Sequence, residues 1–257
     1  LYATRDIAAA IYRKKTYDFY KCLYVVAYQQ NLHFRQFFKV IDLMGYDWAK
    51  DLVHVAYGMV SLEDGAMSTR TGNVVLLEDV INKTVEKARK VIEEKNPDIP
   101  DKETTAKAVG VGAVIFSALS NNKIKDIVFS YDRVLSFEGE TCPYLQYTVA
   151  RCNSLLKKCG EPETYTVTDV NEEEYAVISA IGRFNETVKA AGEKYEPSLI
   201  TRYALDLASA FNKFYINCKI ATEREEVRNF RLSIVKGVKI TLTNALSLLG
   251  IDTVEQM

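Results

Sequence analysis

Residues 21–28 read K-C-L-Y-V-V-A-Y, a nearly continuous apolar run. Such a run is typical of a strand buried on both faces of a parallel sheet. A second run, L-V-H-V-A-Y-G-M-V, occupies residues 52–60. Helical spacing covers 4–15, where Thr4 or Asp6 is placed to act as the N-cap, and returns over 32–44. The order helix, strand, helix, strand predicts an α/β unit with a parallel sheet and right-handed connections.

A hydroxyl-rich loop follows the second predicted strand, where residues 65–73 read G-A-M-S-T-R-T-G-N. Ligands of open parallel sheets gather beyond the carboxyl ends of the strands. Hydroxyl groups and the fixed positive charge of Arg70, carried on flexible backbone, suit phosphate oxygens. Taken alone, a loop of this composition is more often a plain surface connection. Its position after the strand favours a phosphate site.

The rest of the chain is mostly helical in pattern. The spacing of apolar residues predicts helices over 78–95, 102–120, 143–159, 172–194, 197–221 and 224–249, with an extended connector over 126–137. Gly250 is placed to end the last helix. The change of composition near 138–143 predicts a domain boundary, with one domain over 1–141 and an all-helical domain over 142–257.

Composition restricts the class of protein. The chain has 257 residues, of which 48% are hydrophobic and 26% charged, and its formal net charge is −1. These values predict a soluble globular protein without a uniformly basic coat, and no apolar run reaches the roughly 18 residues of a membrane span. Five scattered cysteines, with no C-x-x-C pair, indicate a reducing compartment, which we take as the cytoplasm. Two histidines exclude a three-histidine metal site, and no bound protein metal is expected.

Four segments resemble arginyl-tRNA synthetase, a class I aminoacyl-tRNA synthetase. They are Y-A-T-R-D-I-A at 2–8, Y-V-V-A-Y-Q-Q-N-L-H-F-R-Q at 24–36, H-V-A-Y-G-M-V at 54–60 continuing into M-S-T-R-T-G-N, and F-E-G-E-T-C-P-Y-L-Q-Y-T-V-A-R at 137–151. The resemblance runs along the whole chain. It implies the C-terminal part of a Rossmann-like catalytic domain, followed by a helical anticodon-binding domain of the DALR type.

The resemblance implies a role for the loop in closing over ATP. Met67, Ser68, Thr69 and Arg70 are similar to the last four letters of the family's K-M-S-K-S motif. The two lysines of that motif are replaced by Ala66 and Thr69. Such loops stabilise the departing pyrophosphate, which requires donors aimed at phosphate oxygens.

Further roles follow from the same resemblance. Tyr2, Asp6 and Gln30 are placed in the pocket for the arginine substrate, and a carboxylate is the best partner of a guanidinium. Without the resemblance, Asp6 is better explained as a charge that stabilises the N-terminal helix dipole. Asp6→Asn is expected to keep the fold and to weaken arginine use sharply.

The nucleotide candidates are His33, His54, Tyr57 and Val60. The resemblance places His33 near the ATP phosphates or the aminoacyl-adenylate, whereas a plain helix-start histidine would bond only backbone. His54 lies within an apolar strand, where a satisfied core histidine is the commoner case. Residues Tyr57–Val60 are a candidate shelf for adenine, read mainly through backbone groups.

The helical domain supplies the candidates for tRNA contact. These are Tyr144, Arg151, Asn212, Tyr215, Lys219 and Met257. Aromatic rings stack on splayed bases, and cationic side chains meet phosphates. Phe211 and Phe214 share helical spacing with Tyr215 and are expected to be core. Cys142 replaces the glycine usual in the family, so its loop is expected to differ in backbone conformation.

The implied reaction joins L-arginine to tRNA(Arg) through arginyl-adenylate, with ATP and Mg²⁺ as substrate. The chain lacks the family's His-Ile-Gly-His motif, so we expect a C-terminal portion that is inactive alone, with an apolar patch exposed near 21–28 and 52–60. We expect the protein to be a monomer and to have no membrane partner. One alternative is a non-catalytic protein, derived from a synthetase, that binds tRNA or another partner. Another is the cysteinyl enzyme, whose zinc ligands are not recognisable here.

Overall fold

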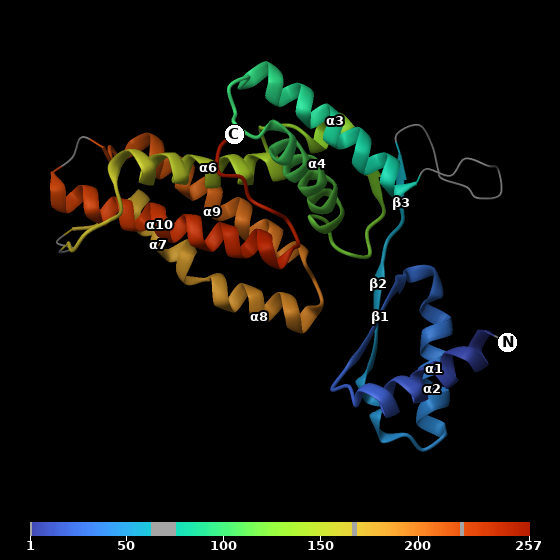
Figure 1. The fold of residues 1–257 in the computed structure, drawn as a ribbon. Coiled ribbons are helices and arrows are strands. Elements are labelled where there is room, and N and C mark those ends of the chain that lie inside the picture. The colour runs from blue at the N-terminus through green and yellow to red at the C-terminus, as the bar shows by residue number, and fades with distance from the viewer. Residues whose placement is uncertain (1, 63–75, 166–168, 222–223) are drawn as a thin grey trace. The chain divides into compact units, whose positions relative to one another are not determined.

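The computed structural model describes residues 2–62, 76–165, 169–221 and 224–257. The chain divides into two compact units, drawn in Figure 1: residues 1–60 with 123–127, and residues 61–122 with 128–257. The predicted phosphate loop, 65–73, lies outside the described residues. The domain boundary at 141/142 stays a prediction, because compact units and evolutionary domains need not coincide.

The first unit has the predicted order of helix, strand, helix and strand. It contains α1 (Tyr2–Tyr17), β1 (Cys22–Ala27), the 3-10 turn η1 (Tyr28–Gln30), α2 (Asn31–Leu43), the 3-10 turn η2 (Asp47–Asp51) and β2 (Leu52–Tyr57). β1 and β2 are parallel, with Cys22 opposite Leu52. Since α1 already begins at Tyr2, the predicted caps at Thr4 and Asp6 are wrong; these residues lie inside the helix, where an N-cap conformation is impossible.

The two faces of β1 differ in burial. Tyr24 and Val26 pack on a core that includes the buried Phe34 and Phe37 of α2. Leu23 and Val25 point to the opposite face and are 45% and 63% exposed. The expectation that this strand is buried on both faces is therefore wrong for the described chain, because α1 and α2 lie on the same side of the strand pair (Figure 1). The predicted apolar patch near the strands is confirmed.

The predicted strand over 52–60 is interrupted. β2 ends at Tyr57, and β3 (Val60–Leu62) pairs with β4 (Ile127–Phe129) in a separate two-stranded sheet. The interruption arises because the N–H groups of Gly58 and Met59 bond to residues of 123–127. The predicted extended connector over 126–137 is correct only for β4, since a short helix, α5 (Tyr131–Val134), follows it.

The second unit is helical. Beside α5 it contains α3 (Leu77–Lys95), α4 (Lys102–Leu119), α6 (Cys142–Cys159), α7 (Glu172–Gly182), α8 (Phe184–Lys194), α9 (Ser198–Asn217) and α10 (Glu225–Leu248). The predicted helix over 172–194 is two helices, because the N–H of Arg183 bonds to Ala180 three residues back and closes α7. The helix predicted over 197–221 ends early, since Cys218 is extended. Gly250 has a φ of +72°, as its predicted role requires.

A small residue lets α4 pack closely against α3. A Cβ on Gly110 would lie 2.6 Å from Val85 Cα of α3, so only glycine permits this approach. α6, α9 and α10 lie alongside one another in Figure 1. Phe211 and Phe214 of α9 are fully buried among them, as predicted.

A buried ion pair joins α7 to α10. Arg231 Nε donates to Glu174 Oε1 at 2.7 Å, and the two side chains are 13% and 5% exposed. Glu174 Oε2 also accepts from the Asn171 N–H at 2.9 Å, while Asn171 Oδ1 accepts from the Glu174 N–H. Glu174 therefore completes a capping box and neutralises a buried guanidinium at once.

Glu174→Ala should lower the free energy of unfolding by about 3 kcal/mol, because it leaves the Arg231 charge buried without this partner. Urea unfolding followed by circular dichroism measures the effect. Glu172→Ala is the control, since Glu172 lies in the same first turn and is exposed; it should cost less than about 1 kcal/mol. Equal losses in the two variants would contradict the prediction.

Tyr203 also links two helices, because its hydroxyl donates to the Ala180 carbonyl at 2.8 Å. Burial raises the pKa of Tyr203 from the ordinary 10.0 to about 12, although the nearby Arg183 charge opposes the shift. The folded state thus keeps the phenol neutral at a pH where the unfolded chain ionises it. This contribution to stability is complete below pH 10 and disappears as the pH rises to about 12.

Tyr203→Phe should cost about 1 kcal/mol of unfolding free energy at pH 8, through the lost hydrogen bond. Between pH 8 and pH 11, wild type should lose roughly 1 kcal/mol more than the variant, since the variant has no phenol to ionise at this position. Urea titrations at the two pH values provide the comparison. Parallel losses in the two proteins would show that Tyr203 ionises alike when folded and unfolded.

Candidate functional site

Asp6 of α1 and His33 of α2 are in direct contact. His33 Nε2 lies 2.7 Å from Asp6 Oδ2, and the two side chains are 29% and 42% exposed. α1 has no acidic residue in its first turn, so the explanation of Asp6 as a dipole-stabilising charge is wrong. His33 bonds a carboxylate instead of backbone alone. A candidate arginine ligand and a candidate ATP ligand therefore meet although 27 residues separate them.

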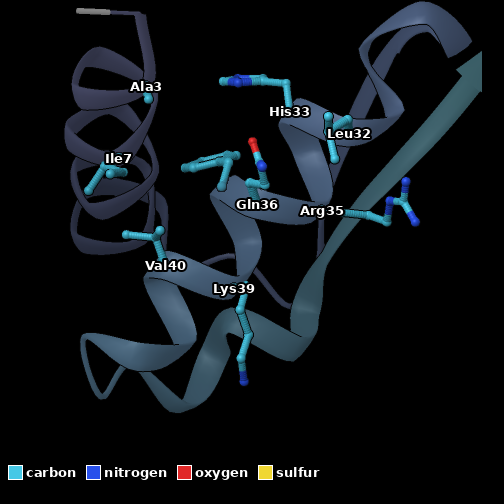
Figure 2. Close-up of a pocket in the computed structure, with 9 residues that line it drawn as sticks. Ala3, Ile7, Leu32, His33, Arg35, Gln36, Lys39 and Val40 are labelled. Atoms are coloured by element: carbon cyan, nitrogen blue, oxygen red, sulfur yellow. The ribbon is translucent and has the colours of Figure 1, made fainter.

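A hollow of about 740 Å³ lies between these two helices. Figure 2 shows Ala3 and Ile7 on α1 and His33, Gln36 and Val40 on α2 lining it. Its wall is mainly apolar, with the polar groups of α2 at its edge. This combination suits a ligand with a hydrocarbon stem and a polar end group.

The other two arginine candidates lie near the same helices. Tyr2 is the first residue of α1 and is 87% exposed. Gln30 ends η1, directly beyond the carboxyl end of β1, and is exposed. Among the described residues, no side-chain hydrogen bond or ion pair joins Tyr2 or Gln30 to Asp6. Their shared role in one pocket stays a prediction.

The nucleotide candidates on β2 occupy different environments. His54 Nε2 bonds to the Val26 carbonyl at 3.0 Å, and its ring stacks on Phe34 with a centroid distance of 4.2 Å. These contacts favour the structural role for His54. Tyr57 and Val60 flank the interruption after β2 and are 44% and 41% exposed. They are available at the carboxyl end of the strand, where ligands of parallel sheets bind.

Met67, Ser68, Thr69 and Arg70 lie outside the described residues. Their role in contacting phosphate stays a prediction. The described chain resumes at Leu76, just before α3.

Arg151 is the centre of a cluster on the helical unit. Its guanidinium lies 4.8 Å from the ring centroid of Tyr147 and 4.6 Å from that of Tyr215. Its Nη1 donates to Asn212 Oδ1 at 2.8 Å. The structure thus brings together three of the six predicted tRNA candidates, from α6 and α9. Both rings are 38% exposed, so the cluster offers two aromatic faces and a cation to solvent.

Tyr147 was missed by the sequence analysis. It precedes Arg151 by four residues, and that spacing places both side chains on one face of a helix. An aromatic residue four positions from a candidate arginine was the available signal.

The remaining tRNA candidates lie elsewhere on the unit. Tyr144 packs on the main core of the helical unit, and burial raises its pKa although the charge of Arg151 opposes the shift. Lys219 is exposed, and its carbonyl accepts from Arg231 Nη1 at 2.5 Å. Met257 packs on a second core with Val254 and Ala150. These three residues are not joined to the Arg151 cluster by a hydrogen bond or ring contact in the described chain.

Two amides of α6 hold the C-terminal segment. The fully buried Gln146 donates through Nε2 to the carbonyls of Ala108 and Asp252, at 3.1 and 2.8 Å. Asn153 donates to the Glu255 carbonyl at 3.3 Å. The segment that carries Met257 is thereby fixed against the helix that carries Arg151.

Cys142 does not produce the unusual loop expected from its replacement of glycine. It is the first residue of α6, behind the Thr141 N-cap, and a helical backbone accepts any L-residue there. Burial raises the pKa of Cys142 and raises that of Cys152 to about 12. Thiols of this kind are unreactive.

The described part of the chain contains neither a metal-binding cluster nor a membrane-spanning helix. No group of three or more His, Cys, Asp or Glu residues there is arranged to hold a metal ion. Among its helices, none combines the length and the apolarity that crossing a bilayer requires.

Family comparisons agree with this geometry. Residues 1–131 match the model of the class I tRNA synthetase (R) catalytic domain, and residues 145–257 match the DALR anticodon binding domain. The chain belongs to the class I tRNA synthetases, with part of the catalytic domain and a helical anticodon-binding domain. Within that class its relatives are of the arginyl type.

The chain is 56% identical to an arginine–tRNA ligase of Halothermothrix orenii over 261 residues, and 54% identical to one of Clostridioides difficile. Both matches cover 100% of this chain and 46% of the relative, so the chain spans about half the length of the curated relatives it matches. The arginyl-tRNA synthetase of Thermus thermophilus superposes with a TM-score of 0.86 at 36% identity, over 92% of this chain and 41% of that one.

Proposed function

We propose that the protein containing this chain attaches L-arginine to tRNA(Arg) in two steps. In the first, an arginine carboxylate oxygen attacks the α-phosphorus of ATP, and the bond to pyrophosphate breaks. In the second, a ribose hydroxyl of the terminal tRNA adenosine, the 2′-hydroxyl as in other class I enzymes, attacks the arginyl carbonyl and AMP leaves. Mg²⁺ accompanies ATP and screens the charge of its phosphates.

The observation that supports this proposal best is the contact between Asp6 and His33 at 2.7 Å. Activation requires the carboxylate of arginine to meet the α-phosphate, so the two binding regions must adjoin. Asp6 is proposed to bind the guanidinium, with Tyr2 and Gln30 beside it. A carboxylate has two oxygens and several lone pairs, so it can accept from arginine while it orients His33.

The nucleotide region is proposed to lie at the carboxyl ends of β1 and β2. His33 serves the phosphates or the adenylate, and Tyr57 and Val60 flank the adenine. His54 contributes by packing behind this region, given its backbone hydrogen bond. The loop residues Met67, Ser68, Thr69 and Arg70 are proposed to donate to the departing pyrophosphate as its charge develops.

tRNA is proposed to contact the helical unit at Arg151, Asn212 and Tyr215, with Tyr147 added to them. Tyr144, Lys219 and Met257 extend this surface. We propose a monomer that works in the cytoplasm, with domains over 1–141 and 142–257. The names of the relatives disfavour the cysteinyl alternative, since those relatives are arginine–tRNA ligases.

The test is arginine-dependent charging of tRNA(Arg) by the full-length gene product, with the isolated 257-residue chain assayed in parallel. Asp6→Asn should lower kcat/KM for arginine by about a hundredfold, because an amide loses the charge that pairs with guanidinium. The same variant should unfold within about 1 kcal/mol of wild type, since the Asp6–His33 pair is partly exposed.

Three results would count against parts of this proposal. A full-length product without charging or pyrophosphate exchange would favour the non-catalytic tRNA- or partner-binding alternative. Normal arginine kinetics in Asp6→Asn would remove Asp6 from the pocket. Unchanged charging after combined Ser68→Ala and Arg70→Ala substitution would mean that the loop at 65–73 is a plain connection.

Arg151→Ala should weaken binding of tRNA(Arg) to the full-length protein by about tenfold, through the loss of its charge and of the stacked guanidinium. Arg151→Lys should recover less than half of this loss, because an ammonium has no planar face. Fluorescence anisotropy with labelled tRNA(Arg) measures the affinity. Arg183→Ala is the control for a lost positive charge, since Arg183 lies between α7 and α8, and should bind as wild type does.

A further inference from the structure

The carboxylate of Asp126 joins the ends of both parallel strands. Its Oδ1 accepts from the Met59 N–H at 2.7 Å, just beyond β2. Its Oδ2 accepts from the Tyr28 hydroxyl at 3.4 Å, just beyond β1. Asp126 follows these residues by 67 and 98 positions, so the contact is made by a distant return of the chain.

The backbone of the returning segment, 123–127, follows the same turn. The Gly58 N–H donates to the Lys123 carbonyl at 2.7 Å, and the Ile127 N–H donates to the Met59 carbonyl at 2.8 Å. Gly58 and Met59, the two residues that follow β2, are therefore both bonded to the segment 123–127. Asp126 supplies the acceptor for Met59, between these two backbone bonds.

Gly58 makes this approach possible. A Cβ at position 58 would lie 2.3 Å from the Lys125 carbonyl oxygen, which no real side chain tolerates. The obstructing atoms belong to the backbone of Lys125 and Asp126, so they cannot move aside as a flexible side chain would. The turn after β2 is thus held by three hydrogen bonds and by close steric contact.

The turn lies where a ligand of the sheet is expected. Ligands of open parallel sheets bind beyond the carboxyl ends of the strands, and Asp126 reaches the ends of β1 and β2 together. Tyr57 and Val60, the proposed neighbours of adenine, flank the two bonded residues and keep exposed side chains. A backbone shelf can recognise a base only if its position is fixed before the base arrives.

We propose that Asp126 is a positioning residue for ATP: its carboxylate fixes the Gly58–Met59 turn and so the shelf between Tyr57 and Val60. This inference rests on the proposed function, because it requires ATP at this end of the sheet. Asp126 acts through Met59 and makes no contact with the nucleotide itself. Its loss should therefore affect use of ATP and leave use of arginine nearly unchanged.

Arginine-dependent exchange of pyrophosphate with ATP, catalysed by the full-length gene product with tRNA(Arg) present, tests the proposal. Asp126→Ala should raise KM for ATP by about tenfold, the lower end of the range expected for one lost hydrogen bond to a charged group. KM for arginine should change less than twofold. Asp126→Asn should stay within twofold of wild type, because its amide oxygen still accepts from Met59 and its NH₂ can donate to the Tyr28 oxygen.

Two further variants separate the contacts. Tyr28→Phe removes only the longer hydrogen bond and should leave KM for ATP within twofold. Asp132→Ala is the matched control, since Asp132 is an exposed carboxylate that pairs with Lys87 at 2.6 Å, and it should behave as wild type. An effect of Tyr28→Phe as large as that of Asp126→Ala would overturn the assignment to Met59.

The outcomes distinguish this inference from the proposed function. Exchange by wild type with an unchanged KM for ATP in Asp126→Ala would overturn the role of Asp126 alone. Equal increases in KM for ATP and for arginine, or a lower kcat with both KM values unchanged, would show a general structural defect and also overturn it. A wild-type product without exchange would defeat the proposed function itself.

Discussion

Parallel pairing of β1 with β2 places the chain segments that follow the two strands at the same end of the sheet. The register runs from Cys22 opposite Leu52 to Ala27 opposite Tyr57, so both strands end together. The chain then leaves β1 through Gln30 and His33, and leaves β2 through Gly58 and Met59. Antiparallel strands would have placed these two groups of residues at opposite ends of the sheet. The pairing therefore brings the candidate groups that follow β1 and β2 to the same end of the sheet.

The helices of the first unit complete the arrangement. α2 packs its phenylalanines on Tyr24 of β1, with a centroid distance of 5.3 Å between Tyr24 and Phe34. That packing fixes the start of α2, and so brings His33 to Asp6 of α1. His33 lines the apolar hollow between these helices and bonds to the Asp6 carboxylate. A carboxylate near an apolar wall fits the proposed arginine substrate, which has a cationic end and a hydrocarbon stem.

The helical unit uses α6 in a similar way. One face of this helix carries Gln146 and Asn153, whose amides hold α4 and the C-terminal segment. Another carries Tyr147 and Arg151, which stack together and reach α9. A rigid helix that is fixed on one side can present an aromatic and cationic surface on the other with little loss of entropy on binding. This property suits recognition of unpaired bases.

The sequence by itself determined the class of protein, the order of elements in the first sixty residues and the buried phenylalanines of α9, because these depend on local periodicity and on motifs contiguous in the chain. Only the tertiary structure decided that Asp6 meets His33, that Arg151 lies between Tyr147 and Tyr215, and that Asp126 holds Met59. It also decided the exposure of Leu23 and Val25, since an apolar strand does not reveal how many of its faces are covered. Apart from the local pair of Tyr147 and Arg151, these contacts join residues 27 to 67 positions apart or depend on neighbouring layers, and local patterns carry no information on either.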